Sequence, residues 1–440
     1  MAKFTRDIIK VSGSNTSAAI VNIIIGIILT RLLGPEGRGI YAAIIVVPMI
    51  VLSFAELGIR RSSIYHIGKK EFSDQDLISS LMFTMLLSTG LGAVICIFFF
   101  SFVNNPEFTI PLIIMAVMRI PVRLVRQYAS GVFMGKEQFG LSIIVQWLYI
   151  FSYLFFIILF LWVMRLDVLG ALMAMVVSNV VASGYAIYKV SREIKISMKF
   201  NSNVLKSLVK FGLIYSAALF VMTLNIKVDI LILGSLSTME QVGFYSLATA
   251  IVSNWQVPFS IGGLIISKSA NSTDHNLMNF KIARLIRISF VVSLGMYSVL
   301  YFIVPYLISI LYGSEFMASV QMVRILIPGI LMLIIVRLMG NRLAGEGRPY
   351  IFMVISIPAL IINIGLNYLW IPQFEGVGAA MATVVSYSFL AIFGLIIYSR
   401  VVKMPVREIF RFQRGDMDFL VNMIQKRINK RKRKKNSAPD

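Results

Sequence analysis

The chain alternates between long apolar runs and short polar connections. Each run holds about 20 or more residues, the length that an α-helix needs to cross the hydrocarbon core of a bilayer. Strands of a membrane β-barrel would be shorter and would alternate in polarity. The pattern therefore predicts an all-α polytopic membrane protein of about twelve spans. These cover approximately residues 14–33, 39–59, 77–103, 109–134, 141–164, 168–188, 211–234, 241–267, 285–311, 316–340, 350–371 and 376–399.

The composition supports lipid as the solvent and argues against catalysis. Hydrophobic residues make up 58% of the chain and charged residues 14%, whereas about a quarter of a soluble protein is charged. No connection is long enough for a water-soluble domain with catalytic acids, so we expect no enzyme. Cys96 is the single cysteine, and the two histidines, His66 and His275, lie in charged loops. We therefore expect no metal site and no other cofactor.

The positive charges are concentrated in every second connection. The net charge is +22. If the N-terminus is cytoplasmic, the cytoplasmic connections and the C-terminal tail hold 33 Lys and Arg residues, and the outer connections hold three, Arg31, Arg38 and Arg165. Because Lys and Arg are retained on the cytoplasmic side during insertion, this split predicts that both termini are cytoplasmic. It also explains the charge without nucleic acid as a partner.

Two segments repeat across the chain. Residues 170–178 (GALMAMVVS) and 378–386 (GAAMATVVS) agree at seven of nine positions, and GIY at 39–41 matches GFY at 243–245. An even number of spans separates the members of each pair, so the two halves have the same orientation. Parallel repeats are typical of transporters, with the substrate site between the halves. We predict an N-terminal six-helix lobe (1–200), a C-terminal six-helix lobe (201–403) and a basic tail (404–440).

Charged residues inside the predicted spans are mostly basic. Each costs roughly 2.5 kcal/mol or more at the bilayer centre unless it is paired or faces water. The only acids are Glu56 and Asp229. The excess of cations predicts an electropositive cavity that favours an anionic ligand. The cations are Arg119, Arg123, Arg126, Lys227, Arg324 and Arg337.

Three of these arginines lie on one helical face. Arg119, Arg123 and Arg126 are spaced i, i+4 and i+7, which places them within about 60° of one another at 100° per residue. The guanidinium fork suits the oxygens of a diphosphate. Alternatively, Arg126 and Arg123 extend to the cytoplasmic interface, or Glu56 pairs with one of them.

The span at 211–234 carries charges on two faces. Lys227 and Asp229 are two residues apart and therefore point in nearly opposite directions. Asn225 and Asp229 share a face, which we expect to line the cavity. Asp229 is either a proton or sodium site or the partner of an arginine across the cavity, and we favour the second interpretation.

The tail combines basic and apolar residues. Residues 407–428 are predicted to form an amphipathic helix at the membrane interface. A cluster of Lys and Arg follows at 430–435, and we expect it to bind anionic lipid headgroups rather than nucleic acid.

Four stretches of the chain form a recognisable set: LTRLLGPEGRGIY at 29–41, ELGI at 56–59, VDILILG at 228–234 followed by GFY at 243–245, and residues 340–350. Together they resemble the polysaccharide repeat-unit (Wzx-type) flippases of the multidrug/oligosaccharidyl-lipid/polysaccharide exporter superfamily. The resemblance implies two lobes arranged as a V, a cationic central cavity and alternating access. It also implies a bacterial cytoplasmic (inner) membrane and partnership with other membrane proteins of polysaccharide assembly.

The implied substrate is an undecaprenyl-diphosphate-linked oligosaccharide, moved to the outer leaflet for O-antigen, capsule or exopolysaccharide. Its diphosphate would be bound by Arg119, Arg123 and Arg126, together with Lys227, Arg324 and Asn225, while Glu56 and Asp229 would couple transport to an ion or pair with a cavity cation. The alternative is a multidrug cation antiporter of the same superfamily, whose cavity would need acids in excess. A major-facilitator transporter is disfavoured because the connection at 60–76 lacks the Gly-rich, Asp-Arg signature.

Overall fold

A computed structural model describes residues 2–103, 105–194, 201–255, 275–412 and 416. Helices dominate these residues, and none of them forms a strand. The helices are α1 (Ala2–Ala55), α2 (Ile59–Lys69), α3 (Asp74–Phe102), α4 (Ile110–Gly135), α5 (Phe139–Ile157), α6 (Asp167–Glu193), α7 (Ser202–Leu236), α8 (Met239–Asn254), α10 (His275–Leu311), α11 (Ser319–Gly345), α12 (Pro349–Val402) and α13 (Val406–Phe410), with a π-helical turn η1 (Ile158–Val163) after α5 and a 3-10 turn η3 (Ser314–Phe316) before α11.

Polar caps begin several of the helices. The Ser73 hydroxyl accepts a hydrogen bond from the Asp76 amide at the start of α3 (3.1 Å). Asn201 caps α7 and Thr238 caps α8 in the same way. Each cap satisfies a backbone N–H that the first turn of a helix leaves without a partner.

The long helices α1 and α12 each fold back on themselves. A continuous helix of 54 residues would be about 80 Å long, far more than the roughly 30 Å of the hydrocarbon core. Gly34 in α1 and Glu375 in α12 have non-helical backbone angles. A Cβ atom on Gly378 would lie 2.4 Å from the Trp370 carbonyl oxygen, whereas residues eight apart in a straight helix are about 12 Å apart. Each helix therefore holds two of the predicted spans.

Eight helices among the described residues are long and apolar enough to cross a membrane. Two of them, 13–69 and 350–402, include the turns described above. The predicted span at 109–134 coincides with α4, which carries three arginines, and the span at 241–267 begins as α8 and continues outside the described residues. The polytopic helical fold is confirmed, and the count of twelve stays a prediction.

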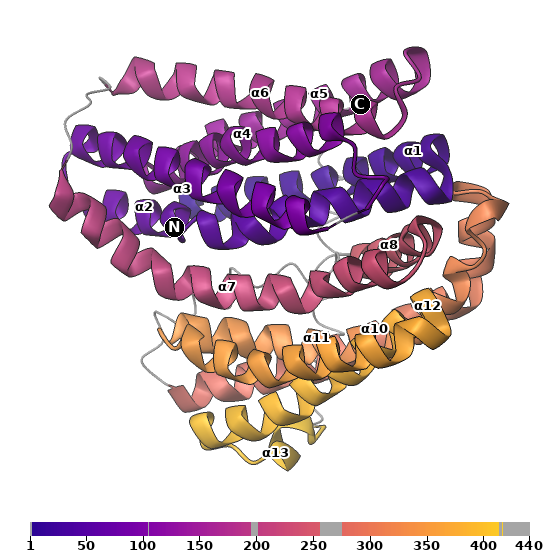
Figure 1. Ribbon diagram of the computed structural model, residues 1–440. Helices are drawn as coiled ribbons and strands as arrows, with labels where there is room; N and C mark the ends of the chain where they lie inside the picture. Colours follow the sequence, from indigo (N-terminus) through magenta and orange to yellow (C-terminus); the bar gives the residue numbers. More distant parts are fainter. Residues whose placement is uncertain (1, 104, 195–200, 256–274, 413–415, 417–440) are drawn as a thin grey trace, which may run out of the picture.

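The helices pack as two groups that meet along α1, α7 and α8. Helices α3–α6 contact α1, and α2 contacts α3 and α4. Helix α11 contacts α10 and α12, α12 contacts α7, and both α11 and α12 contact α8. Helix α1 contacts α7 and α8, and α2 and α3 contact α7. Figure 1 shows the first group in indigo to magenta above α7, and the second in orange to yellow below it. The boundary between lobes near residue 200 remains a prediction.

The segment after α12 differs from the prediction. Helix α13 ends at Phe410, and Arg411 and Phe412 are not helical, so the helix predicted over 407–428 is interrupted there, and its remainder after Phe412 stays a prediction. The chain instead turns toward α10, where the Asp416 carboxylate lies 2.8 Å from the Nε atoms of Arg284 and Arg287. Residues 413–415 and 417–440, including the basic cluster, lie outside the described residues.

Candidate functional site

A cavity of about 250 Å³ lies where α1, α7, α8, α11 and α12 meet. Its charged lining residues are Arg38 and Lys227, and no acid lines it among the residues that the structure describes. Hydroxyl groups supply most of its other polar atoms. They belong to Tyr41, Tyr245, Ser246, Thr249, Ser253, Thr383 and Tyr387. We call this space the central cavity.

Arg38 belongs to the central cavity, although the charge pattern assigned it to an outer connection. Its side chain is 9% exposed and its guanidinium donates to the Thr30 hydroxyl. The turn at Gly34 brings these two residues together across the fold-back of α1. The glycines on either side, Gly37 and Gly39, were the available signal, since each marks a close contact. A Cβ on Gly37 would lie 3.3 Å from the Leu33 Cβ, and one on Gly39 would lie 1.7 Å from the Met239 carbonyl oxygen.

Arg119 lies beside this cavity. It is 5% exposed and donates from Nη1 to the carbonyl oxygen of Ile45 (3.2 Å), a residue of the cavity wall. Its Nε is buried without a hydrogen-bond partner among the described residues. The charges of Asp229, Arg119 and Arg38 all act on Lys227, that of Asp229 most strongly. Three cations from different helices therefore gather at one place.

The other two arginines of α4 continue toward the basic connections. The Arg126 guanidinium lies 4.0 Å from the centre of the Tyr149 ring, and Arg123, between them in sequence, is half-buried. The Glu56 carboxylate accepts a hydrogen bond from Gln127 (3.1 Å). No ion pair joins Glu56 to Arg123 or Arg126 within 4 Å in the described part of the chain, although the charge of Arg123 acts on Glu56.

Asp229 is fully buried in the C-terminal half. Its carboxylate accepts hydrogen bonds from the hydroxyls of Tyr245 and Thr383 (both 2.8 Å) and from the Asn367 amide (2.6 Å). No arginine or lysine of the described residues lies within ion-pair distance. The arginine partner that we favoured for Asp229 is therefore wrong.

The cavity face of α7 is also the reverse of what we expected. Lys227 lines the central cavity, whereas Asp229 and Asn225 point toward α12, where the Asn225 amide lies 3.4 Å from the Ser356 carbonyl oxygen. The opposite orientation of Lys227 and Asp229 is confirmed. Helical periodicity relates the two faces to each other, but it does not say which of them meets the cavity.

The residues around Asp229 form an oxygen-rich cluster. The Asn367 amide also donates to the side-chain oxygen of Asn363 (3.2 Å), and the Asn367 side-chain oxygen is buried without a partner in the described structure. Sequence analysis missed Thr383. It occupies the position of Met175 in the repeated GA-MA-VVS segment, so this difference between the repeats was the signal.

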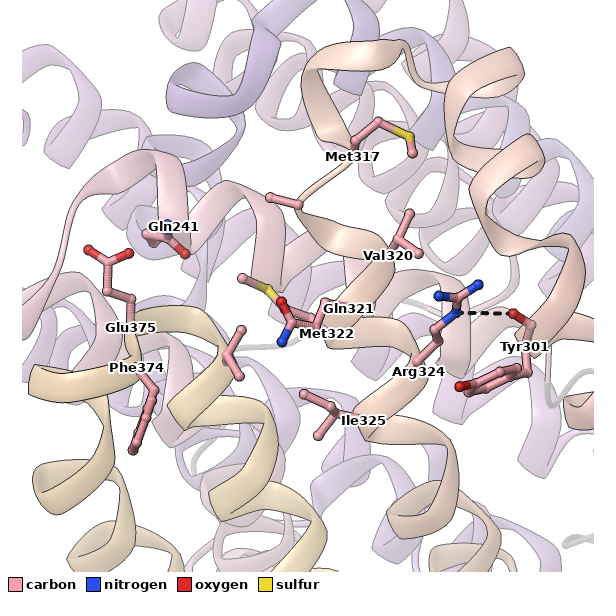
Figure 2. A pocket seen from close by; sticks show the side chains of 12 residues that line it. Gln241, Tyr301, Met317, Val320, Gln321, Met322, Arg324, Ile325, Phe374 and Glu375 are labelled. Atoms are coloured by element: carbon pink, nitrogen blue, oxygen red, sulfur yellow. Dashed lines mark hydrogen bonds between the residues drawn. The ribbon is translucent and has the colours of Figure 1, made fainter.

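Arg324 lies apart from the other cations. Its guanidinium is 4.8 Å from the centre of the Tyr301 ring, and its Nε lies 3.3 Å from the Tyr301 carbonyl oxygen. Figure 2 shows these two residues at one side of a separate hollow of about 690 Å³. The cavity-lining residues of α11, Leu326 and Ile330, lie on the opposite helical face.

Residues 4–263 match the family described as polysaccharide biosynthesis protein. The chain belongs to this family. The capsular polysaccharide biosynthesis protein CapF of Staphylococcus aureus is 23% identical over 401 residues, which cover 88% of this chain and 97% of the relative.

The fold is also found in solved transporter structures. The lipid II flippase MurJ in an inward closed conformation superposes with a TM-score of 0.72 at 12% identity, covering 94% of this chain and 96% of MurJ. An inward-facing multidrug resistance MATE family transporter of the MOP superfamily has a TM-score of 0.71 at 17% identity, covering 88% and 94%. The family and these folds confirm the resemblance stated from the sequence.

Proposed function

We propose that the chain translocates an undecaprenyl-diphosphate-linked oligosaccharide from the cytoplasmic to the outer leaflet of a bacterial cytoplasmic membrane. Both termini would be cytoplasmic, and the product would serve O-antigen, capsule or exopolysaccharide assembly together with other membrane proteins of that process. The basic tail would bind anionic lipids.

The main support for this proposal is the positive charge of the central cavity. Arg38 and Lys227 line it, Arg119 lies beside it with a buried, unpartnered Nε, and no acid lines it among the described residues. Buried cations without counter-ions are costly in a low-dielectric site. A diphosphate would neutralise them and accept several charge-assisted hydrogen bonds. Arg123 and Arg126 would guide the headgroup from the basic face.

A flipping assay on purified protein in liposomes tests the proposal. A fluorescent undecaprenyl-diphosphate oligosaccharide should cross faster than in empty liposomes, and unlabelled diphosphate lipid should compete. A lipophilic cation should not compete. If the labelled lipid does not cross and the liposomes instead take up or release the cation, the proposal is overturned in favour of a multidrug antiporter. The excess of cations at the cavity disfavours that alternative, because like charges repel a cationic drug.

The Asp229 cluster is our candidate for energy coupling. Its carboxylate accepts three hydrogen bonds but has no cationic side-chain partner among the described residues. A buried carboxylate without a counter-charge is unfavourable, so binding of a proton or a small cation would stabilise it. Rotation of the Asn367 amide by 180° would direct its unpartnered oxygen toward the carboxylate, since amide orientation is assigned rather than observed. Hard cations prefer such oxygen ligands. Glu56, near the charges of Arg60 and Arg123, is the second candidate.

A further inference from the structure

A second hollow lies within the C-terminal half, away from the central cavity. It occupies about 690 Å³ where α8, α10, α11 and the turn of α12 approach one another (Figure 2). It opens at the end of the bundle that holds the turns at Gly34 and Glu375, opposite the basic connections, which we call the outer end. The lining residues are Gln241, Tyr301, Met317, Ala318, Val320, Gln321, Met322, Arg324, Ile325, Phe374, Glu375 and Val377. We call this space the outer hollow.

The cation of the outer hollow is held in place but not neutralised. Tyr301 contacts Arg324 through its ring and its carbonyl oxygen. The two terminal guanidinium nitrogens make no hydrogen bond or ion pair with the described residues. Arg324 therefore holds an oriented pair of N–H donors that no acid of the described residues neutralises. Stacking on an aromatic ring keeps such a fork in one orientation.

The opposite side of the outer hollow carries hydrogen-bonding groups. In Figure 2 Gln241 and Glu375 lie at the side away from Arg324, and Gln321 lies between them. Gly376 leaves room for this arrangement, because a Cβ there would lie 2.4 Å from the Met322 methyl group and 3.0 Å from the Gln241 side-chain oxygen. Glu375 adopts a left-handed φ of 50°, and such strain in a residue other than glycine is often retained at binding sites.

The combination of groups indicates the ligand class. Amide and carboxylate side chains bind hydroxyl groups, exposed aromatic rings such as Tyr301 and Phe374 cover the apolar face of a sugar ring, and the arginine fork binds a carboxylate or phosphate. The volume lies within the range of small-molecule sites, about 300–1,000 Å³. We propose that the outer hollow binds an anionic saccharide, with its acidic group on Arg324 and its hydroxyls on Gln241, Gln321 and Glu375.

All lining residues lie between Gln241 and Val377, within one predicted lobe. Rocking of the two lobes would leave the outer hollow intact, so the site would be available in every state of a transport cycle. It would therefore bind the acidic sugar of a substrate that has already reached the outer leaflet. In this respect the inference rests on the proposed function.

Binding of soluble saccharides to the purified chain in phosphatidylcholine nanodiscs tests the inference by calorimetry. The probes are a glucuronate-containing tetrasaccharide and neutral maltotetraose. We expect the acidic probe to bind more tightly, and Arg324→Gln to weaken it by about tenfold, as for one lost charge-assisted hydrogen bond. The matched control is Arg165→Gln, an exposed cation outside the hollow, which should bind like the parent.

The inference would be overturned if the parent bound the two probes with equal affinity. It would also be overturned if Arg324→Gln and Arg165→Gln lost the same affinity for the acidic probe. Binding of a short-chain phosphatidylglycerol that Arg324→Gln weakens, without binding of either saccharide, would assign the anion site to a lipid headgroup and also overturn the inference. No lipid-linked substrate is used here, so the result is independent of the flipping assay. Flipping without saccharide binding removes only this inference, and saccharide binding without flipping removes the proposed function.

Discussion

Gly39 and Gly243 bring the backbones of α1 and α8 into direct contact at the outer end. A Cβ on Gly39 would lie 3.0 Å from the Gly243 amide nitrogen and 1.7 Å from the Met239 carbonyl oxygen. A Cβ on Gly243 would lie 1.9 Å from the Pro35 carbonyl oxygen. Because Arg38, next to Gly39, lines the central cavity, we infer that this contact closes the cavity toward the outer end.

Adding one methyl group at Gly39 should therefore open the outer end. Overpacking at a close contact costs about 1–3 kcal/mol, which changes a conformational equilibrium by about 5- to 150-fold. In a Cys96→Ser background, spin labels at the exposed positions Glu36 and Glu240 should move farther apart in Gly39→Ala. The matched control is Gly26→Ala in the same helix, where nothing lies within 4 Å of the added atom. Identical distance distributions in Gly39→Ala and the parent would contradict the closed-contact interpretation.

The repeat predicted which tyrosines correspond but not what they contact. Tyr41 and Tyr245 occupy equivalent positions of the GIY and GFY segments. The Tyr41 hydroxyl lies 2.9 Å from that of Tyr153, whereas the Tyr245 hydroxyl donates to Asp229. Tyr153 lies on α5, 112 residues from Tyr41, and Asp229 lies on α7, the helix before the one that holds Tyr245. A short repeated segment carries no information about partners on other helices.

Hydrophobic periodicity predicted the helices and the opposite directions of Lys227 and Asp229, because both follow from the geometry of one helix. Whether a face meets a cavity or another helix depends on tertiary packing. For this reason Asn225 and Arg324 were wrongly grouped with the central cations. Arg38 was missed because a charge beside a turn resembles an exposed loop residue, and its burial depends on the fold-back to Thr30.

Replacing Arg123 of α4 should slow transport. Arg123 is half-buried and has no ion-pair partner within 4 Å among the described residues. Loss of a charge-assisted contact to a diphosphate costs about 1.5–3 kcal/mol. Arg123→Ala should therefore reduce the flipping rate by roughly 10- to 100-fold. Arg123→Lys keeps the positive charge and should retain part of the parent rate. Lys189→Ala, a half-buried cation on α6 that does not line the central cavity, is the control at matched expression. If Arg123→Ala flips as fast as the parent, Arg123 does not bind the headgroup.

The Asp229 cluster predicts a loss of coupling that can be separated from a loss of substrate binding. Flipping by the parent should be stimulated by a sodium or a proton gradient. Asp229→Asn keeps the shape of the side chain but removes its charge, so neither gradient should stimulate it. Thr383→Val should weaken the response by removing one oxygen of the cluster. Thr249→Val is the control, because the Thr249 hydroxyl lines the central cavity and bonds only to the Ser246 carbonyl oxygen among the described residues. A gradient response of Asp229→Asn equal to that of the parent would exclude this carboxylate as the coupling group.

The last prediction concerns the attachment of the chain after α12 to α10. Asp416 is 1% exposed and Arg287 is 2% exposed. Arg287 donates to the carboxylate from Nε (2.8 Å) and from Nη2 (3.2 Å), and from Nη1 to the Ile409 carbonyl oxygen (2.9 Å). Removing one partner of a buried ion pair leaves an uncompensated charge.

Asp416→Ala should therefore reduce the free energy of unfolding by about 3 kcal/mol, the lower end for breaking a buried pair, because Arg284 remains partly exposed and solvated. The measurement is the thermal unfolding midpoint in detergent, with Glu36→Ala at an exposed position as the control. The double variant Arg287→Met with Asp416→Leu should regain part of the lost stability, since it removes both buried charges. An unchanged midpoint in Asp416→Ala would mean that this pair does not hold the segment against α10.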